Sequence, residues 1–363
     1  MTDTADDPTR ASIAKLGSLL VDQHRARIIV PPERSGAGHW FGSGNLSVGP
    51  DGALYLCGRY RNFGDSRTGL GKGERGKELA VFRSTDGAGT FEKLLSFSKR
   101  DLSYGDITVL SIEGSHLHFH ENGVSLYIAT EKDGIGYPEE VSEFHKPGTG
   151  VWTIDRIDAA SVELLDPHRI RPFASSRLPA HLHVKDPFVF TDSGSTYVGY
   201  CTHPFTWASS NTAFHVDDRQ VFDVFPRGPA WDVAVARMTC YAPVPRVGAF
   251  ADTEQHYICF YDGAECVRSL DAHPEAVKRP RGYSCEEIGG LAVARASNLL
   301  VPQRVSVNEA AFTSPWGTGC SRYVDVLFTE EYAYATWQQS QPDQSQPLVM
   351  NRVPMSEVED ALR

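Results

Sequence analysis

Four acidic residues stand near the starts of short apolar segments, where an ionised side chain needs a reason to be buried. Glu113 lies in an otherwise uncharged stretch, Asp186 precedes a proline, and Glu286 stands beside Glu287. A carboxylate in apolar surroundings must find a cation or hydrogen-bond donors, or its pKa rises. A raised pKa suits a general acid, and two carboxyl groups together can cleave an acetal linkage. The sequence therefore makes Asp186, Glu286 and Glu113 the candidate catalytic residues.

The local sequence also predicts how these acids point. The proline after Asp186 favours an extended backbone at Asp186. In a strand, Glu286 and Glu287 would face opposite sides, whereas crowded together one of them would titrate late. Plainer interpretations stay open: a turn or bulge at Asp186, an acceptor for loop amides at Glu113, and an exposed acidic turn at Glu286.

Histidines, aromatic residues and arginines supply candidate substrate contacts. His116, His118 and His120 alternate and would share one face of a strand. Alternate side chains stand about 7 Å apart, so one strand rarely gives three ligands to one ion, and we assign no metal ligand. Aromatic rings can stack on sugars or pack in the core, and arginines can bind acidic groups. The residues expected to bind substrate are His39, Trp40, Arg59, His118, His183, Trp231, Arg237, Tyr283, Glu287 and Arg322.

A repeated hairpin must position these residues. A short apolar strand, a tight turn and a second strand built around a tyrosine recur at intervals of roughly 70 residues. The tyrosines are Tyr55, Tyr127, Tyr197, Tyr257 and Tyr334. Each hairpin alternates apolar and polar residues and must bury one face, which a lone hairpin cannot do stably. Sheets stacked around an axis solve this problem, so we predict an all-β fold, a five-bladed β-propeller.

The repeats run without a linker-like interruption, so residues 1–363 are predicted to form a single β-propeller domain. Residues 1–27 are expected to hold a loose tail and a short helix, because apolar residues within 11–23 form one stripe. Residues 354–363 are expected to form a C-terminal helix opened by a capping box from Ser356 to Glu359.

The charge and composition exclude several classes of partner. A net charge of -11 argues against a nucleic-acid groove or an anionic membrane surface. No apolar run is long enough to cross a membrane, and no secretion signal is evident. The seven cysteines are scattered without a CxxC pair, which indicates buried thiols in a reducing compartment. We therefore expect a cytoplasmic protein with no nucleic-acid partner, no membrane partner and no cofactor; a metal ion on the propeller axis and the oligomeric state stay open.

The acid-bearing motifs resemble those of the five-bladed propeller glycosidases, the group that includes glycoside hydrolase families 32, 43 and 117. Lys185-Asp186-Pro187 is similar to their Asp-Pro signature, and Cys285-Glu286 resembles the acid motif of the fructan-cleaving members. The resemblance implies carboxylates at the starts of inner strands in several blades. Blade one departs from the pattern, because Trp40 and Asn45 stand where an aspartate is usual.

A second motif, from Arg83 to Phe91, resembles the Asp box of sialidases. The box is a structural turn between outer strands of a blade, so it indicates a propeller rather than a substrate. Sialidases also hold the substrate carboxylate with three arginines. The corresponding residues would be Arg59, Arg237 and Arg322, although chance can place arginines near strands too.

These observations predict an exo-acting glycoside hydrolase for small oligosaccharides or glycosides. Asp186 and Glu286 would flank the scissile bond at the mouth of the central funnel, and Glu113 would position or tune them. The alternatives are a lyase acting on a polysaccharide or uronic acid with a histidine or Tyr283 as base, a sialidase-like hydrolase, and a non-catalytic glycan-binding propeller.

Overall fold

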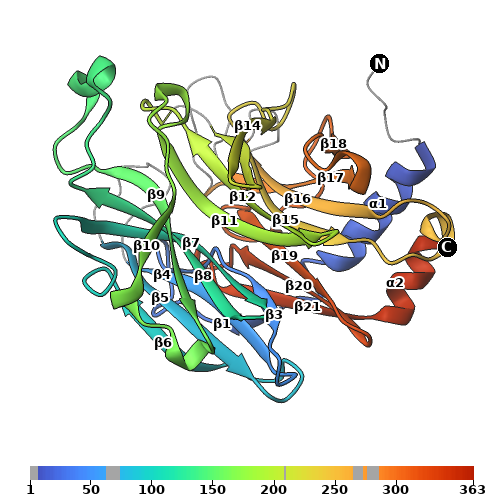
Figure 1. Ribbon diagram of the computed structural model, residues 1–363. Helices are drawn as coiled ribbons and strands as arrows, with labels where there is room; N and C mark the ends of the chain where they lie inside the picture. The colour runs from blue at the N-terminus through green and yellow to red at the C-terminus, as the bar shows by residue number, and fades with distance from the viewer. Residues whose placement is uncertain (1–6, 63–73, 208–209, 265–272, 276–285) are drawn as a thin grey trace.

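Five antiparallel sheets form the five blades of a propeller in the computed structural model, which describes residues 7–62, 74–207, 210–264, 273–275 and 286–363 (Figure 1). Blade 1 consists of β2 (Trp40–Gly42), β3 (Leu46–Val48), β4 (Leu54–Asn62), β5 (Glu74–Ser84) and β6 (Glu92–Ser98). Blade 2 consists of β7 (Thr108–His120), β8 (Gly123–Asp133), β9 (Val151–Ala159) and β10 (Arg171–Ala174). Blade 3 consists of β11 (His183–Asp192), β12 (Ser195–His203), β13 (Asn211–Val216) and β14 (Arg219–Phe225).

The last two blades complete the ring. Blade 4 consists of β15 (Val235–Pro243), β16 (His256–Ala264), β17 (Glu287–Arg295) and β18 (Gln303–Arg304). Blade 5 consists of β19 (Ser321–Phe328), β20 (Tyr332–Gln339), β21 (Leu348–Pro354) and, from the other end of the chain, β1 (Arg27–Val30). The pairing of β1 with β21 closes the ring between the two ends of the chain. The predicted all-β, five-bladed fold is confirmed, and each repeat tyrosine lies in the second strand of a blade.

Apolar side chains fill the interface between each pair of neighbouring blades. Leu79 and Val81 of blade 1, for example, share a buried cluster with Leu117 of blade 2. Equivalent clusters join blades 2 and 3, 3 and 4, 4 and 5, and 5 and 1. Each blade therefore buries both faces, which is the reason that the alternating hairpins require radial packing.

The innermost strand of each blade is interrupted by an irregularity near the axis. Register shifts occur in β7, β11, β15 and β19, and in blade 1 the inner strand is broken between β2 and β3. Three of these irregularities contain a non-glycine residue with positive φ: Ser43 (62°), Asp186 (57°) and Tyr323 (55°). Bulges redirect side chains, and here they form a ring of irregular backbone around the centre.

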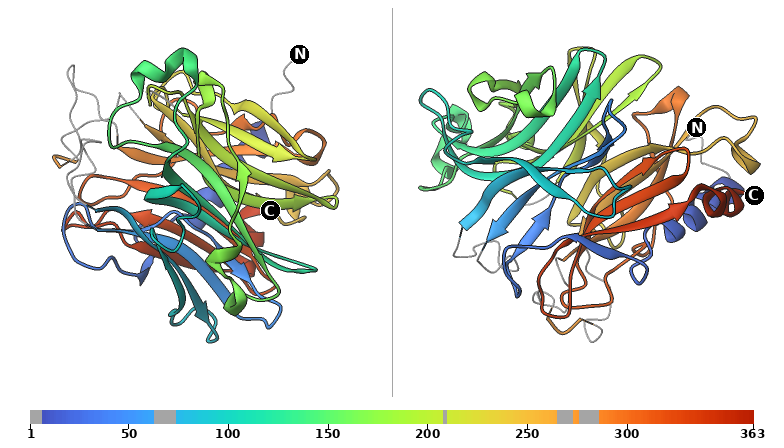
Figure 2. Two further views of the ribbon diagram at one scale, coloured as in Figure 1. Left: turned by 60° about the vertical axis from the view of Figure 1, so that its left-hand side comes forward. Right: turned by 90° about the horizontal axis from the view of Figure 1, so that it is seen from below.

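Helices α1 (Asp7–Leu20) and α2 (Met355–Leu362) lie side by side on the outside of blades 4 and 5 (Figures 1 and 2). The short N- and C-terminal helices are thus confirmed, but α1 begins earlier than the predicted stripe. The predicted capping box is wrong: Pro354 is the N-cap residue and no side chain caps the helix. The helix continues directly from β21, and the first free amide, Met355 N–H, donates to the carbonyl of Glu331 instead.

Short 3₁₀ helices occupy several connections. Their bounds are Glu139–Phe144, Val162–Leu164, Pro167–Arg169, Pro179–His181, Gly248–Phe250 and Ala296–Asn298. None of the helices in the described ranges is long and apolar enough to span a bilayer. The cysteines that the structure describes are buried free thiols: Cys57, Cys201, Cys240, Cys259 and Cys320.

The packing of α1 gives a prediction about stability. Leu16 is fully buried in the core between α1 and blades 4 and 5. Leu16→Ala should lower the free energy of unfolding by about 2 to 5 kcal/mol, because it removes apolar contacts and leaves a cavity. Urea denaturation measures the change. Ser18→Ala, on the exposed side of the same helix, should change stability by less than about 0.5 kcal/mol; equal losses at both positions would show that the helix does not pack as described.

Candidate functional site

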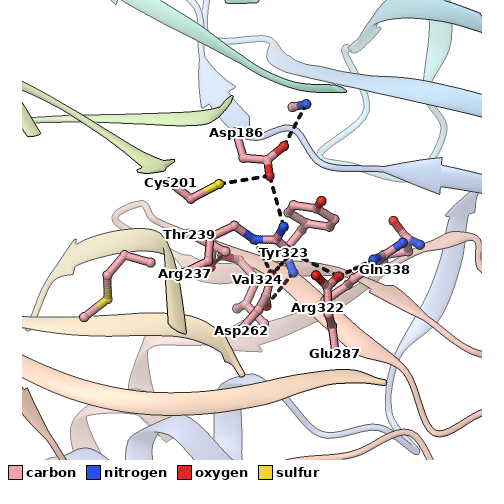
Figure 3. Close-up of polar contacts among 12 residues, drawn as sticks. Asp186, Cys201, Arg237, Thr239, Asp262, Glu287, Arg322, Tyr323, Val324 and Gln338 are labelled. Carbon is pink, nitrogen blue, oxygen red and sulfur yellow. Dashed lines mark hydrogen bonds and ion pairs between the residues drawn. The ribbon is translucent and has the colours of Figure 1, made fainter. Parts of the chain in front are cut away.

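One buried arginine joins the acids of blades 3 and 4. Arg237, on inner strand β15, is 2% exposed. Its Nη1 donates to Asp186 Oδ2 at 3.0 Å, and its Nη2 lies 2.7 Å from Asp262 Oδ2 (Figure 3). The same Nη2 lies 3.1 Å from Glu287 Oε2 (Figure 3). A single guanidinium therefore holds three carboxylates, which would repel one another without it.

Asp186 sits on the bulge of β11, between residues that keep it fixed. Its Oδ1 accepts a hydrogen bond from Gly114 N–H of blade 2 at 3.0 Å. Lys185 Nζ lies 3.9 Å from Oδ2, and the Cys201 thiol lies 3.5 Å from the same oxygen. The predicted extended backbone is wrong: φ is 57°, in the left-handed region. The bulge overrides the preference of a residue before proline, and the contacts of the side chain offset the strain.

A second ion pair, between blades 1 and 2, holds Glu113. Arg59 Nη2 lies 2.6 Å and Arg59 Nε 3.2 Å from Glu113 Oε2. Burial alone would raise the pKa of Glu113, but Arg59 and Lys185 lower it to about 2. Glu113 is therefore ionised at neutral pH, and its side chain is 16% exposed.

Glu286 and Glu287 do not lie where the sequence pattern suggests. Glu286 precedes and Glu287 begins an outer strand, β17, rather than the inner strand of a blade. Glu287 still reaches the cluster, because β15 and β17 run in the same direction and Val235 and Glu287 both face Ala264 of β16. Its side chain, 20% exposed, forms ion pairs with Arg237 and Arg322, and these two arginines lower its pKa against the effect of burial.

Glu286 lies next to the cluster and is buried. Burial raises the pKa of the Cys320 thiol, and the negative charges of Glu286 and Glu287 raise it further. Glu286 and Glu287 therefore both lie close to the start of blade 5.

Asp262 was missed by the sequence analysis. It lies at the end of β16, directly opposite Arg237 in the blade 4 pairing, and accepts a hydrogen bond from Tyr323 N–H at 3.0 Å. Burial, aided by Glu287, raises the pKa of Asp262 to about 6 although Arg237 opposes the rise. Its repeat is the least regular one, and only the Tyr-Asp-Gly sequence at the strand end marks the position.

Two aromatic rings separate the guanidinium groups. Tyr323, on the bulge of β19, has its ring centre 4.2 Å from the Arg237 Cζ and 5.1 Å from the Arg322 Cζ. The ring centre of Trp40 lies 4.4 Å from Arg322 Cζ and 5.8 Å from Arg59 Cζ. These contacts bring together the three arginines that the sialidase likeness singled out, together with Trp40.

The other predicted contacts are dispersed. His183 stacks on Trp207 at the start of blade 3, and burial lowers the pKa of His183 to about 2. His39 is buried ahead of β2. His118 lines a surface groove toward the other end of β7, and Trp231 is buried in the core with its indole bonded to Ser306 O. His118 therefore lies toward the other face of the propeller from the arginine–carboxylate cluster, and Trp231 lies in the core between blades 3 and 4.

Tyr283 lies outside the described residues. In the described part of the chain, no three His, Cys, Asp or Glu side chains are placed to bind a metal ion, His116, His118 and His120 included. The Nε2 atom of His116 instead lies 3.2 Å from Nδ2 of Asn45, where blade 1 packs against blade 2.

The inner strand of blade 1 carries no carboxylate, as the sequence indicated. Ser43 occupies the irregularity that corresponds to Asp186 and Tyr323. Asn45 links blade 1 to blade 2, because its side chain accepts a hydrogen bond from Leu117 N–H at 2.7 Å and donates one to Leu117 O at 3.0 Å. Blade 1 contributes arginines to the site rather than an acid.

Comparison with solved structures decides the class of fold. An α-L-arabinofuranosidase from Lactobacillus brevis is similar with a TM-score of 0.55, 11% identity and coverage of 93% of each chain. This chain therefore shares its fold with solved structures of glycoside hydrolases. A protein described as a glycoside hydrolase has a TM-score of 0.59 at 11% identity, with 96% of each chain covered. A thermostable family-43 glycoside hydrolase has a TM-score of 0.51 at 14% identity, covering 89% of this chain and 92% of that one.

The predicted resemblance to the propeller glycosidases is therefore confirmed for the architecture. No protein-family model and no curated protein sequence matches the chain. The turn that resembles an Asp box joins β5 to β6: Ser84 Oγ donates to Asp86 Oδ1 at 2.7 Å, and Thr90 N–H donates to the same oxygen at 3.0 Å. This turn stabilises the outer part of blade 1 and lies apart from the arginine–carboxylate cluster.

The Arg59–Glu113 pair gives a pH-dependent prediction. The pKa of Glu113 falls from an ordinary 4.5 to about 2 on folding, so the pair stabilises the folded state above pH 4.5 and loses that contribution as the pH falls toward 2. Glu113→Gln should therefore lower the free energy of unfolding by about 3 kcal/mol at pH 6, a difference that narrows at pH 3. Urea denaturation at both pH values tests it.

Glu33→Gln is the control, because Glu33 pairs with Lys77 on the surface. It should cost less than about 1 kcal/mol at pH 6. A cost of Glu113→Gln that stayed constant from pH 6 to pH 3 would contradict the ion-pair account.

Proposed function

We propose that this protein is a glycoside hydrolase whose acidic groups act in the arginine–carboxylate cluster. The observation that carries the proposal is the convergence of acids from blades 2, 3 and 4, with Glu113 and Glu287 partly exposed and Asp186 held between them in a strained backbone. Strained residues cluster at functional sites, because the surrounding structure must compensate for them. The similarity to propeller glycoside hydrolases supports the same reaction class.

The acids suit different tasks. Asp186 accepts bonds from Gly114 and Arg237, so its carboxylate has a fixed orientation, in which it would act next to the bond to be cleaved. Glu286 and Glu287 form the second carboxyl position, and one of them would supply the proton or activate water. Glu113, ionised beside Arg59, would stabilise the positive charge that develops on the sugar ring.

Aromatic rings border the acids on the blade 3 side. His183 stacks on Trp207 with ring centres 3.5 Å apart, and Trp207 is 37% exposed. Lys185, next to Asp186 in sequence, has its Nζ 5.5 Å from the ring centre of Trp152. The exposed indole of Trp207 in this aromatic group would provide a stacking surface for a sugar ring.

We propose exo-action on the end of a glycan, with the inner strands forming the floor of the site. Deeper along the inner strands, the enclosed space has a volume of only about 20 Å³ and is lined by Ser43, Ser115, His116, Asp186, Thr239 and Tyr323, among others. This volume is enough for about one water molecule. This space is too small for a sugar ring, so a substrate would enter from the mouth of the funnel and, in the proposed exo-action, place its terminal residue against this floor.

The test is turnover of aryl glycosides and natural oligosaccharides by the full chain and by amide variants. Asp186→Asn should reduce the turnover number by a factor of about a hundred to ten thousand with folding retained. Glu286→Gln and Glu287→Gln, assayed separately, should show which of the two acids takes part in the reaction, because the larger loss marks the participating carboxyl group.

Asp192→Asn is the matched control, since Asp192 ends the same strand and accepts a bond from Tyr257. This variant should keep full turnover. An active Asp186→Asn variant would remove Asp186 from the reaction, and an unsaturated product absorbing in the ultraviolet would show elimination in place of hydrolysis.

A further inference from the structure

The structure assigns a binding subsite for an oxyanion to Arg59, Arg61 and Trp40, on the blade 1 side of the acid cluster. This inference rests on the proposed function and gives the substrate class: a glycoside that carries a carboxylate. The same donors would also bind free phosphate, which is the other source of a small oxyanion. The inference concerns the half of the site to which blade 1 contributes no acid.

Three buried donors of this group have no acceptor in the described structure. They are Arg59 Nη1, Arg61 Nε and Trp40 Nε1. Arg59 is 2% exposed and Trp40 is 4% exposed. Buried donors normally have partners, because leaving one unpaired loses its hydration without replacement. A hydrogen-bond acceptor on a bound ligand would give these three donors a partner.

The strands place the three donors together. Arg59 and Arg61 alternate on β4 and so share one face, and Trp40 of β2 pairs directly with Arg61. The Arg61 Cζ lies 4.3 Å from the ring centre of Trp40. Arg322 approaches the same ring at 4.4 Å from blade 5. Three guanidinium groups therefore surround one indole.

The carboxylates nearby are already engaged. Glu113 is held by Nε and Nη2 of Arg59, and Glu287 is shared by Arg237 and Arg322. Among the described residues, no carboxylate lies within 4.0 Å of the Arg61 guanidinium. Positive charge is thus in excess at Arg61.

The charge state of Arg61 reflects this excess. Burial, together with the charges of Arg59, Arg322 and Arg75, lowers the pKa of Arg61 to about 10, although Glu113 opposes the change. A bound oxyanion would counter both effects, since it adds negative charge and accepts hydrogen bonds from the guanidinium.

The set of arginines differs from the one that the sialidase likeness suggested. Arg237 gives its Nη1 and Nη2 to Asp186, Asp262 and Glu287, so it has a structural role within the cluster. Arg61 takes its place, because it keeps a donor available beside Arg59. The planar guanidinium can donate two parallel hydrogen bonds to a carboxylate or a phosphate. A neutral sugar hydroxyl cannot accept both of these bonds in the same way.

The experiment measures binding rather than turnover, by isothermal titration calorimetry on the full chain at low ionic strength and pH 7. The probes are D-glucuronate and D-galacturonate, their neutral counterparts D-glucose and D-galactose, and inorganic phosphate. We expect at least one acidic sugar to bind about tenfold or more tightly than its neutral counterpart, with phosphate competing for the same site. Binding of phosphate with no binding of either uronate would assign the subsite to free phosphate.

Arg61→Gln should abolish the preference for the anion, and Arg61→Lys should retain part of it, which keeps the test valid if the glutamine variant fails to fold. Arg83→Gln is the control, because Arg83 lies on the neighbouring strand β5 and pairs with Asp51 near the surface. No preference for any anion, or a preference unchanged by Arg61→Gln, would overturn the inference. A chain that binds the uronate but cleaves no glycoside would overturn the proposed function alone.

Discussion

The centre of this propeller depends on one shared cation. Arg237 holds Asp186 of blade 3 and Asp262 and Glu287 of blade 4, and its guanidinium lies against the ring of Tyr323 from blade 5. Three carboxylates brought this close would drive one another's pKa upward. The guanidinium removes that repulsion, and it does so where water is largely excluded, so the pairing is strong and its loss would leave buried acids unpaired.

The irregular backbone around the axis is the second constraint. Inner strands converge there, and regular pairing would point alternate side chains only toward neighbouring blades. The bulges with positive φ at Ser43, Asp186 and Tyr323 redirect side chains and carbonyls toward the centre. Such backbone conformations are energetically unfavourable. Proteins retain them where function requires a fixed geometry.

The charges divide the site into two halves. On the side of blades 3 and 4 the acids are paired, and their pKa values separate, with that of Asp262 raised to about 6 and that of Glu287 lowered. On the side of blade 1, Arg59, Arg61 and Trp40 provide donors without a matching acid. A substrate with a cleavable bond over the acids and a negative group over the arginines would be oriented by both halves.

The sequence by itself determined the repeat, because strand alternation, turn residues and the repeat tyrosines are local properties. It also marked Asp186 and Glu113 as acids of inner strands and Arg59, Arg237 and Arg322 as arginines near strands. It could not give Asp262, Arg61 or the role of Glu287. The partners of these residues lie far away in sequence; Asp262 and Tyr323, for example, are 61 positions apart. Strand register and blade order decide which side chains meet at the axis, and only the tertiary structure supplies them, since a shift of one residue would turn each side chain to the opposite face.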